Sequence, residues 1–208
     1  MQKYNIFTKY HSVLITNQPL KTLDIEDKQI IQCNKENYLE IPFSQLLKET
    51  PKKKSVIINV LDMNIDKVFF ECTKHYLFVQ AAGGLVRNDL NEILFIFRNG
   101  KWDLPKGHKE IGETIQETAI REVQEECGLT DLVLKEKLGL TYHVYYMNGR
   151  KELKETHWYN MTTKTMELIP QKEEGIEKAQ WIGEDKIDEI IANSYLNLQN
   201  LLKENKLF

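Results

Sequence analysis

The sequence lacks a long apolar run and an excess of charge of either sign, and each absence excludes a class of protein. No window of its 208 residues approaches the ~18 consecutive apolar residues of a membrane span, and the first residues lack the apolar stretch of a secretory signal. Lysine and arginine number 28 against 31 aspartates and glutamates, a formal net charge of −3. The overall charge therefore indicates neither nucleic acid nor a membrane surface as a partner.

Cysteine and histidine are too few and too scattered to form a framework. The three cysteines, Cys33, Cys72 and Cys127, are odd in number and lie far apart. An unpaired thiol favours a reducing compartment, so we expect three buried free cysteines and a cytoplasmic location. The five histidines show no metal-ligand spacing, and a zinc site is not expected.

What the sequence does have is the composition of a folded chain, with 41% hydrophobic and 28% charged residues. We predict two parts: a small N-terminal α/β subdomain over residues 1–75, and a larger domain over 76–208 that ends in a helix. In the first part, the pattern indicates a strand or hairpin over 4–16, a short helix over 41–47, a buried strand over 55–61 and a helix capped by Asn64.

In the second part, strands alternate with two main helices. Strands are predicted near 76–86, 92–98, 139–147, 156–163 and 178–182, and helices near 113–127 and 184–204. Asn99-Gly100 is a strong hairpin signal, and Pro105-Lys106-Gly107 is expected to end the strand that follows it. Mixed strands between helices predict an α/β (α+β) sandwich.

The most informative segment is residues 107–129, called the box segment below. On a helix with 100° per residue, Ala119, Val123 and Cys127 share the core-facing stripe. Three carboxylates, those of Glu122, Glu125 and Glu126, fall in the neighbouring arc. Because this arc adjoins the core, part of it should be half-buried, although a solvated acidic face is the common alternative.

Half-buried carboxylates of like charge favour a bound cation, and ligands that are all oxygen suit Mg²⁺ or Mn²⁺. Arg121 is placed to pair with Glu117 or Glu125, but the helical projection points it away from the middle of the acidic arc. The box segment holds six glutamates against Lys109 and Arg121, a local charge of −4, whereas the rest of the chain sums to +1.

The box segment resembles the Nudix box, G-x5-E-x7-R-E-U-x-E-E-x-G-U, where U is aliphatic. Every position is filled, by Gly107, Glu113, Arg121, Glu122, Val123, Glu125, Glu126, Gly128 and Leu129. At ~7% per position, the seven fixed residues match by chance on the order of once in 10⁸ starting points. The flanks, including Ala82-Gly83-Gly84 and Trp102–Pro105, are similar to the family as well, and the resemblance covers about residues 76–190.

The resemblance implies a Nudix α/β/α sandwich with a mixed sheet and hydrolysis of a nucleoside diphosphate linked to another group. It implies that Glu122, Glu125 and Glu126, with the carbonyl of Gly107, hold Mg²⁺ or Mn²⁺. Glu113 and Arg121 would brace the box structurally. The general base is either a box glutamate such as Glu122 or one of the later pair Glu173 and Glu174, for which an ordinary acidic turn is the alternative.

The substrate is less defined. The surroundings of Lys106 and His108 are similar to diadenosine tetraphosphate hydrolases of this superfamily, and Lys154 lies where those enzymes place a phosphate-binding lysine. For His108 and Lys154, a solvated surface side chain is the common alternative. Dinucleoside polyphosphates, ADP-ribose, nucleotide sugars and nucleoside triphosphates stay open. Trp102, Tyr145, Trp158 and Tyr159 are candidates for base stacking, with core packing as the more frequent role.

Two other functions are considered. A Nudix-like module that binds a nucleotide metabolite and regulates is disfavoured by the intact box, and removal of pyrophosphate from RNA 5′ ends would need a basic channel that the sequence does not show. We therefore expect a small-molecule nucleotide as the partner and no nucleic acid. Three roles stay open for residues 1–75: they cover a sheet edge, shape the substrate pocket or build a homodimer interface.

Overall fold

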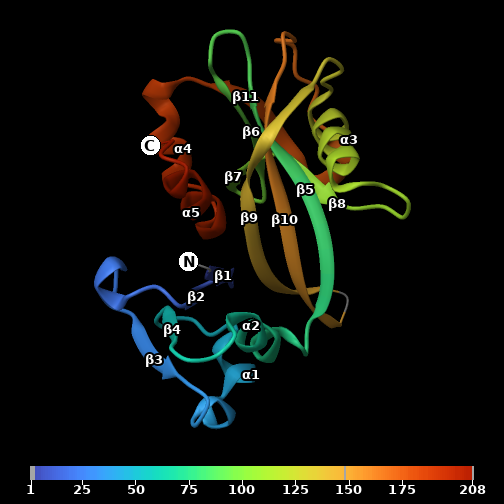
Figure 1. Ribbon diagram of the computed structural model, residues 1–208. Coiled ribbons are helices and arrows are strands. Elements are labelled where there is room, and N and C mark those ends of the chain that lie inside the picture. Colours follow the sequence, from blue (N-terminus) through green and yellow to red (C-terminus); the bar gives the residue numbers. More distant parts are fainter. Residues whose placement is uncertain (1–2, 148, 208) are drawn as a thin grey trace. The chain divides into compact units, whose positions relative to one another are not determined.

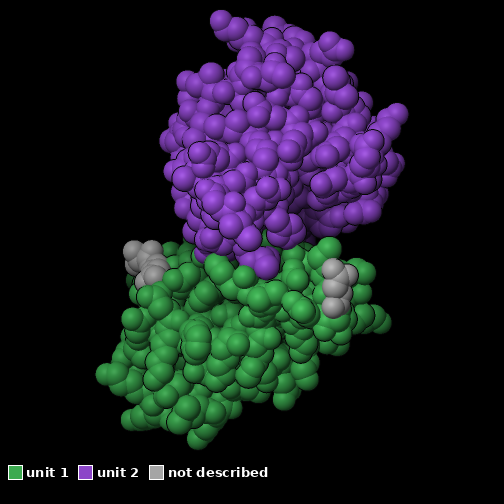
Figure 2. All heavy atoms as spheres, turned by 90° about the vertical axis from the view of Figure 1, so that its right-hand side faces the viewer, with its two compact units in different colours: residues 1–78, 142–154 green, residues 79–141, 155–208 purple. Residues whose placement is uncertain are grey.

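The computed structural model describes residues 3–147 and 149–207, and the chain divides into two compact units. The first unit comprises residues 1–78 and 142–154, and the second comprises 79–141 and 155–208 (Figure 2). The N-terminal unit thus includes residues 142–154 in addition to the N-terminal segment. No helix among the described residues is long and apolar enough to cross a membrane.

The second unit contains the box segment and is built around a sheet. Its strands follow the order β11-β6-β5-β10-β9, with β7 paired to β6 and β8 paired to β5. Their bounds are β5 Leu77–Arg87, β6 Ile93–Arg98, β7 Lys101–Asp103, β8 Lys106–His108, β9 Val133–Met147, β10 Arg150–Thr162 and β11 Ile176–Ile182. Strands β9 and β10 are long and also contribute their connected ends to the first unit.

Helices cover both faces of this sheet. Helix α3 (Ile115–Cys127) lies on one face, and α4 (Ile187–Ala192) and α5 (Leu196–Glu204) lie on the other (Figure 1). Beneath α3, the residues Ala119, Val123 and Cys127 pack with sheet residues in one apolar cluster. A second cluster unites α4 and α5 with Phe95, Trp158 and their neighbours. These layers confirm the predicted α/β sandwich.

The first unit has its own core. Strands β1 (Lys3–Phe7) and β2 (Ser12–Thr16) form an antiparallel hairpin, while β4 (Val56–Val60) pairs in parallel with both β2 and β3 (Gln29–Cys33). Within this unit β1 also pairs in parallel with residues Tyr142 and His143 of β9. The parallel pairs make the pairing of the chain mixed, as predicted.

The remaining elements of the first unit are short. They are α1 (Phe43–Leu46), α2 (Ile65–Thr73) and the 3-10 turns η1 (Leu20–Thr22) and η2 (Tyr38–Glu40). As predicted, Asn64 caps α2, because its side chain accepts from Asp66 N at 2.7 Å. Strand β4 is buried throughout, as its β-branched run indicated. The three cysteines are free and buried, which was also predicted.

One prediction about local structure was wrong, and two strands were not predicted. The C-terminal helix is interrupted between α4 and α5, because Trp102 N donates to the carbonyl of Asn193 at 3.1 Å and Ser194 forms a bridge with Trp102. The strand after Asn99-Gly100 does end before residue 105, as predicted, because β7 ends at Asp103, but β8 (Lys106–His108), which pairs with β5, was not predicted. Strand β3, whose residues are mostly exposed, was not predicted at all.

Candidate active site

Helix α3 has unusually well-defined ends. The Thr114 side chain accepts from Glu117 N at 3.2 Å while the Glu117 carboxylate accepts from Thr114 N at 2.7 Å, so a capping box fixes the start. At the other end Gly128 adopts the left-handed conformation, with φ 74°. Both ends of the helix are therefore fixed, and Glu122, Glu125 and Glu126 lie within its last two turns. We use "box glutamates" for Glu122, Glu125 and Glu126.

Strand β8 places the loop backbone beside this helix. Gly107 is opposite Ala82 and Lys106 is opposite Gly83 in the antiparallel pairing of β8 with β5. A Cβ on residue 83 would overlap the carbonyl of Pro105, so only glycine allows the two backbones to approach this closely. Residue 107 must also lack a side chain, because a Cβ there would overlap the Glu122 carboxylate.

Arg121 joins the loop to the helix through its guanidinium. Its Nε donates to Glu113 Oε1 at 2.5 Å, and Nη2 donates to Glu113 Oε2 and to the carbonyl of His108, both at 3.0 Å. Glu113 also accepts from Glu110 N and from Thr118 Oγ1. Hydrogen bonding to Arg121, with these further donors, lowers the pKa of Glu113 to about 2.

The same guanidinium reaches the box glutamates. Arg121 Nη1 donates to Glu122 Oε1 at 2.7 Å and to Glu125 Oε2 at 2.9 Å. The prediction that Arg121 points away from the middle of the acidic arc was therefore wrong. A helical projection fixes the direction of Cβ, whereas a long flexible side chain can turn back across its own face.

Glu126 is the most deeply buried of the box glutamates, with an exposed fraction of 0%. Its Oε2 accepts from Lys106 N at 2.8 Å, and its Oε1 lies 3.5 Å from Arg98 Nη1. Burial raises the pKa of Glu126 to about 7, although Lys106 and Arg98 oppose this effect. Burial also raises the pKa of Glu122, which is 7% exposed, against the influence of Arg121. The predicted half-burial of the acidic arc is confirmed.

The residues present fit a divalent cation. Carboxylate and backbone carbonyl oxygens are ligands that Mg²⁺ and Mn²⁺ prefer, and the Glu122 carboxylate lies directly against the Gly107 backbone because residue 107 has no Cβ. In residues 3–147 and 149–207 no group of three or more acidic, histidine or cysteine side chains is arranged to hold a metal ion. Mg²⁺ commonly uses one or two carboxylates with water and substrate phosphates, so a full cage is not required.

The later acidic pair lies on the 3-10 turn η3 (Lys172–Glu174), and both side chains are exposed. Glu174 Oε2 lies 3.7 Å from Arg98 Nη1, the same nitrogen that approaches Glu126. The turn is held near the end of α3, because Gln171 N donates to the carbonyl of Glu126 at 3.1 Å. The structure thus brings Glu174 near the box glutamates.

The predicted substrate-contacting residues have different surroundings. Lys106 is buried, and its Nζ pairs with Asp103 Oδ2 at 2.8 Å. His108 has an exposed side chain on the box loop. Lys154 belongs to the other unit, where its Nζ lies 5.1 Å from the ring centroid of Tyr145. The structure does not group these three residues around one pocket within the second unit.

The aromatic candidates mostly serve packing. Trp158 is fully buried and donates from Nε1 to Thr141 Oγ1 at 2.9 Å, and Tyr159 is 7% exposed. Trp102 packs against Phe97, with ring centroids 5.0 Å apart. Core and sheet-face packing, the alternative that we favoured, therefore describes these side chains.

Sequence reasoning missed Arg98 and Asp103. Arg98 ends β6 and links Glu126 to Glu174, while Asp103 ends β7 and holds Lys106. Arg98 is 28 positions from Glu126, and no local pattern indicates a contact across that separation. The only available signal was that a charged residue closes the apolar run Ile93–Phe97.

Comparisons with known proteins agree with this geometry. A family model described as NUDIX domain matches residues 77–200. The chain is 43% identical over 113 residues to a putative mutator protein MutT4 of Mycobacterium tuberculosis, covering 49% of this chain and 45% of that protein. It is 42% identical over 59 residues to the 8-oxo-dGTP diphosphatase of Escherichia coli, covering 25% of this chain and 45% of that protein.

The match therefore spans less than half the length of these curated relatives. Among solved structures, a MutT protein from Methanosarcina mazei superposes with a TM-score of 0.51 at 20% identity, covering 62% of this chain and 93% of that one, which shows the shared fold. The family match takes in well over half of the chain together with the whole box segment, its capped helix and its buried glutamates. The chain belongs to the Nudix family, whose members hydrolyse phosphoanhydride bonds and typically depend on a divalent metal.

Proposed function

We propose that the chain is a pyrophosphohydrolase that cleaves a phosphoanhydride bond of a nucleoside diphosphate derivative in the presence of Mg²⁺ or Mn²⁺. The observation that carries this proposal is the arrangement of the box glutamates on α3 against the Gly107 backbone. In the proposed site, Glu122, Glu125, Glu126 and the Gly107 carbonyl hold the metal. When bound, such an ion offsets the charge of the phosphate oxygens and lowers the pKa of a water molecule.

The other residues of the site have supporting roles in this proposal. Arg121 keeps Glu122 and Glu125 on the loop side of α3 through its 2.7 Å and 2.9 Å contacts, and through Glu113 it fixes the loop itself. Glu126 is held by Lys106 N and needs no rotation to face the loop backbone. Either Glu122 or a glutamate of the pair Glu173 and Glu174 accepts the proton of the attacking water.

For the substrate we favour a (deoxy)nucleoside triphosphate, which would yield a nucleoside monophosphate and pyrophosphate. Support comes from the curated relatives, whose names are a putative mutator protein and an 8-oxo-dGTP diphosphatase. Dinucleoside polyphosphates, ADP-ribose and nucleotide sugars share the same bond and are the competing substrates. Lys106 and His108, both in the second unit, are proposed to contact substrate phosphates, with Lys106 first having to leave Asp103.

A panel of nucleotides tests the proposal. The chain is incubated with canonical and oxidised nucleoside triphosphates, diadenosine tetraphosphate, ADP-ribose and a nucleotide sugar, with Mg²⁺, Mn²⁺ or EDTA, and the products are weighed by mass spectrometry. We expect turnover that requires the metal and is highest for a nucleoside triphosphate. Faster cleavage of another nucleotide in the panel would make that nucleotide the proposed substrate instead. Activity in EDTA would contradict the metal assignment.

The same panel separates the alternatives. Saturable nucleotide binding without turnover under any metal condition would favour a regulatory module over an enzyme. Adding a 5′-triphosphorylated RNA tests removal of pyrophosphate from RNA ends.

A further inference from the structure

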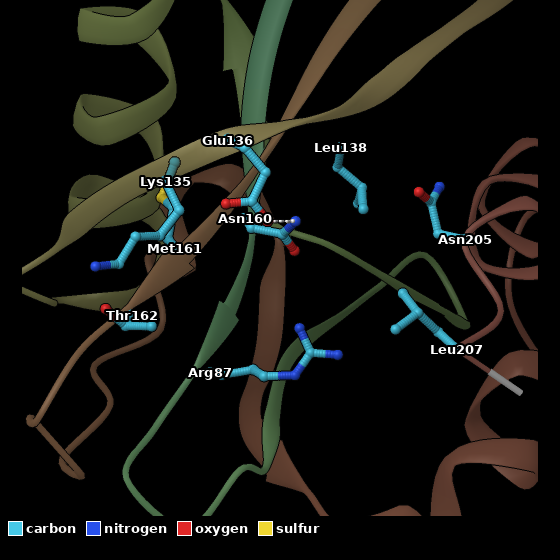
Figure 3. Close-up of a pocket in the computed structure, with 9 residues that line it drawn as sticks. All are labelled: Arg87, Lys135, Glu136, Leu138, Asn160, Met161, Thr162, Asn205 and Leu207. Atoms are coloured by element: carbon cyan, nitrogen blue, oxygen red, sulfur yellow. Dashed lines mark hydrogen bonds between the residues drawn. The ribbon is translucent and has the colours of Figure 1, made fainter.

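A pocket in the second unit lies outside the box segment. It has a volume of ≈ 360 Å³, within the range of small-molecule sites. It is lined by nine residues from β5, β9, β10 and the C-terminal segment: Arg87, Lys135, Glu136, Leu138, Asn160, Met161, Thr162, Asn205 and Leu207 (Figure 3). None of these residues belongs to α3 or to the box loop, so this is a separate site.

Arg87 dominates the chemistry of this pocket. Its side chain extends from the end of β5 toward Leu207 (Figure 3) and is half-buried. Across the described ranges 3–147 and 149–207, its guanidinium makes no hydrogen bond or ion pair. Burial lowers the pKa of Arg87, and among residues 3–147 and 149–207 no carboxylate offsets that effect.

Its situation differs from that of the arginines of the active site. Arg98 approaches Glu126 and Glu174, and Arg121 contacts three glutamates. The Arg87 guanidinium is not among the fully buried polar groups that lack a partner, so it keeps some contact with water but loses part of its hydration, and an anion in the pocket would replace that loss. Arg87 therefore has its donors available inside a concave surface.

The one carboxylate of the pocket has another partner. Glu136 Oε1 accepts from Asn160 Nδ2 at 2.7 Å (Figure 3). This pairing holds Glu136 to β10 instead of to Arg87. The remaining polar lining comes from Lys135, Thr162 and Asn205, while Leu138, Leu207 and Met161 supply apolar wall.

We propose that this pocket is a second small-molecule site that binds an oxyanion through the guanidinium of Arg87, with an apolar part of the ligand against Leu138 and Leu207. A planar guanidinium recognises phosphate and carboxylate through two parallel hydrogen bonds, which a lysine does not reproduce. The ligand is thus a phosphorylated or carboxylated compound of metabolite size. It binds without a metal, which distinguishes this site from the box glutamates.

The experiment measures binding by calorimetry in EDTA, so that metal-dependent binding at the box is absent. The probes are inorganic phosphate, a nucleoside monophosphate and a medium-chain fatty carboxylate, which separate a phosphate source from a carboxylate source. We expect one of them to saturate with 1:1 stoichiometry. Substituting Arg87→Gln should weaken that binding at least ~10-fold, and Arg87→Lys should restore only part of it.

The matched control is Lys137→Gln, which removes the same charge from an exposed position on β9 outside the lining. It should leave the affinity unchanged. Thermal melting shows whether the Arg87 variants fold; if Arg87→Gln does not, Thr162→Val replaces it as a change within the lining and should also weaken binding. Equal losses in the control and the pocket variants, unchanged binding in Arg87→Gln, or no saturation by any probe would each overturn the proposal.

Discussion

The Glu122 carboxylate occupies the space in which the Cβ of residue 107 would lie. Glycine is therefore required at position 107 because of the space that Glu122 fills. The reason is not a left-handed backbone conformation. A side chain at position 107 must displace the carboxylate, and Arg121 holds that carboxylate at 2.7 Å.

Gly107→Ala is therefore expected to impair activity more than folding. The Glu122 side chain can rotate away at modest cost in stability, but a metal ligand displaced by about an ångström lowers kcat roughly 100-fold. Steady-state kinetics and thermal melting of the same preparation measure both effects. Gly139→Ala is the control, since its Cβ meets a methyl group of Leu201 at 3.1 Å and no site residue. A kcat close to that of the parent would show that Glu122 need not hold this position.

Glu126→Gln should strongly reduce metal-dependent turnover while the fold persists. The amide oxygen can still accept from Lys106 N, and a neutral group avoids the cost of burying a carboxylate. The loss of a charged ligand is expected to lower kcat by on the order of 10²–10³-fold. Glu177→Gln, an exposed position on β11, controls for charge removal. Activity near that of the parent would remove Glu126 from the metal assignment.

Arg121→Lys should loosen the box loop. A lysine cannot reproduce the fork that reaches Glu113, Glu122 and the His108 carbonyl together. We expect the free energy of unfolding to fall by about 1–2 kcal/mol and amide exchange in residues 108–113 to accelerate. Because Arg121 and Glu113 act as a pair, the double variant with Glu113→Gln should lose less than the sum of the single losses. Additive losses would indicate that the two residues act independently.

Features that depend on residues close together in the sequence could be predicted, whereas contacts between distant segments could not. The end of α3 at Cys127 and the partial burial of the acidic arc depend on neighbours within a few turns, and these were predicted, whereas the capping box at Thr114 was not. The contacts of Arg98 with Glu126 and of Trp102 with Asn193 join distant segments, so no local pattern contains them. The direction of Arg121 was missed for a different reason: the rotamer that a long side chain adopts depends on its partners.

His11 should make the first unit sensitive to acid. Its ring is 2% exposed, with Nε2 at 2.8 Å from the carbonyl of Leu46 and Nδ1 at 2.9 Å from Thr8 Oγ1. Burial lowers its pKa below 6.5; the Leu46 carbonyl and nearby Glu49 oppose that effect, and nearby Lys53 adds to it. As pH falls below about 6.5, His11 becomes protonated in the unfolded chain more readily than in the folded chain. The free energy of unfolding therefore decreases in that pH range.

Thermal melting between pH 7.5 and 5 measures this effect. In His11→Gln the melting temperature should depend less on pH, even if the variant is less stable throughout. His75→Gln, at an exposed position, should keep the slope of the parent. An unchanged slope in His11→Gln would assign the acid sensitivity to other groups.

The two glutamates of η3 provide a matched pair for locating the general base. Glu174 lies 3.7 Å from Arg98, which also approaches Glu126, whereas the adjacent Glu173 has no such link to the box glutamates among the contacts of the described residues. If the base resides on this turn, Glu174→Gln should lower kcat by ~10²–10⁴-fold, and Glu173→Gln should leave kcat unchanged. KM should change little in both variants, because neither side chain is required to hold the metal. A Glu174→Gln enzyme that retains its activity would leave Glu122 as the base, and Arg98 would then serve to orient Glu126 alone.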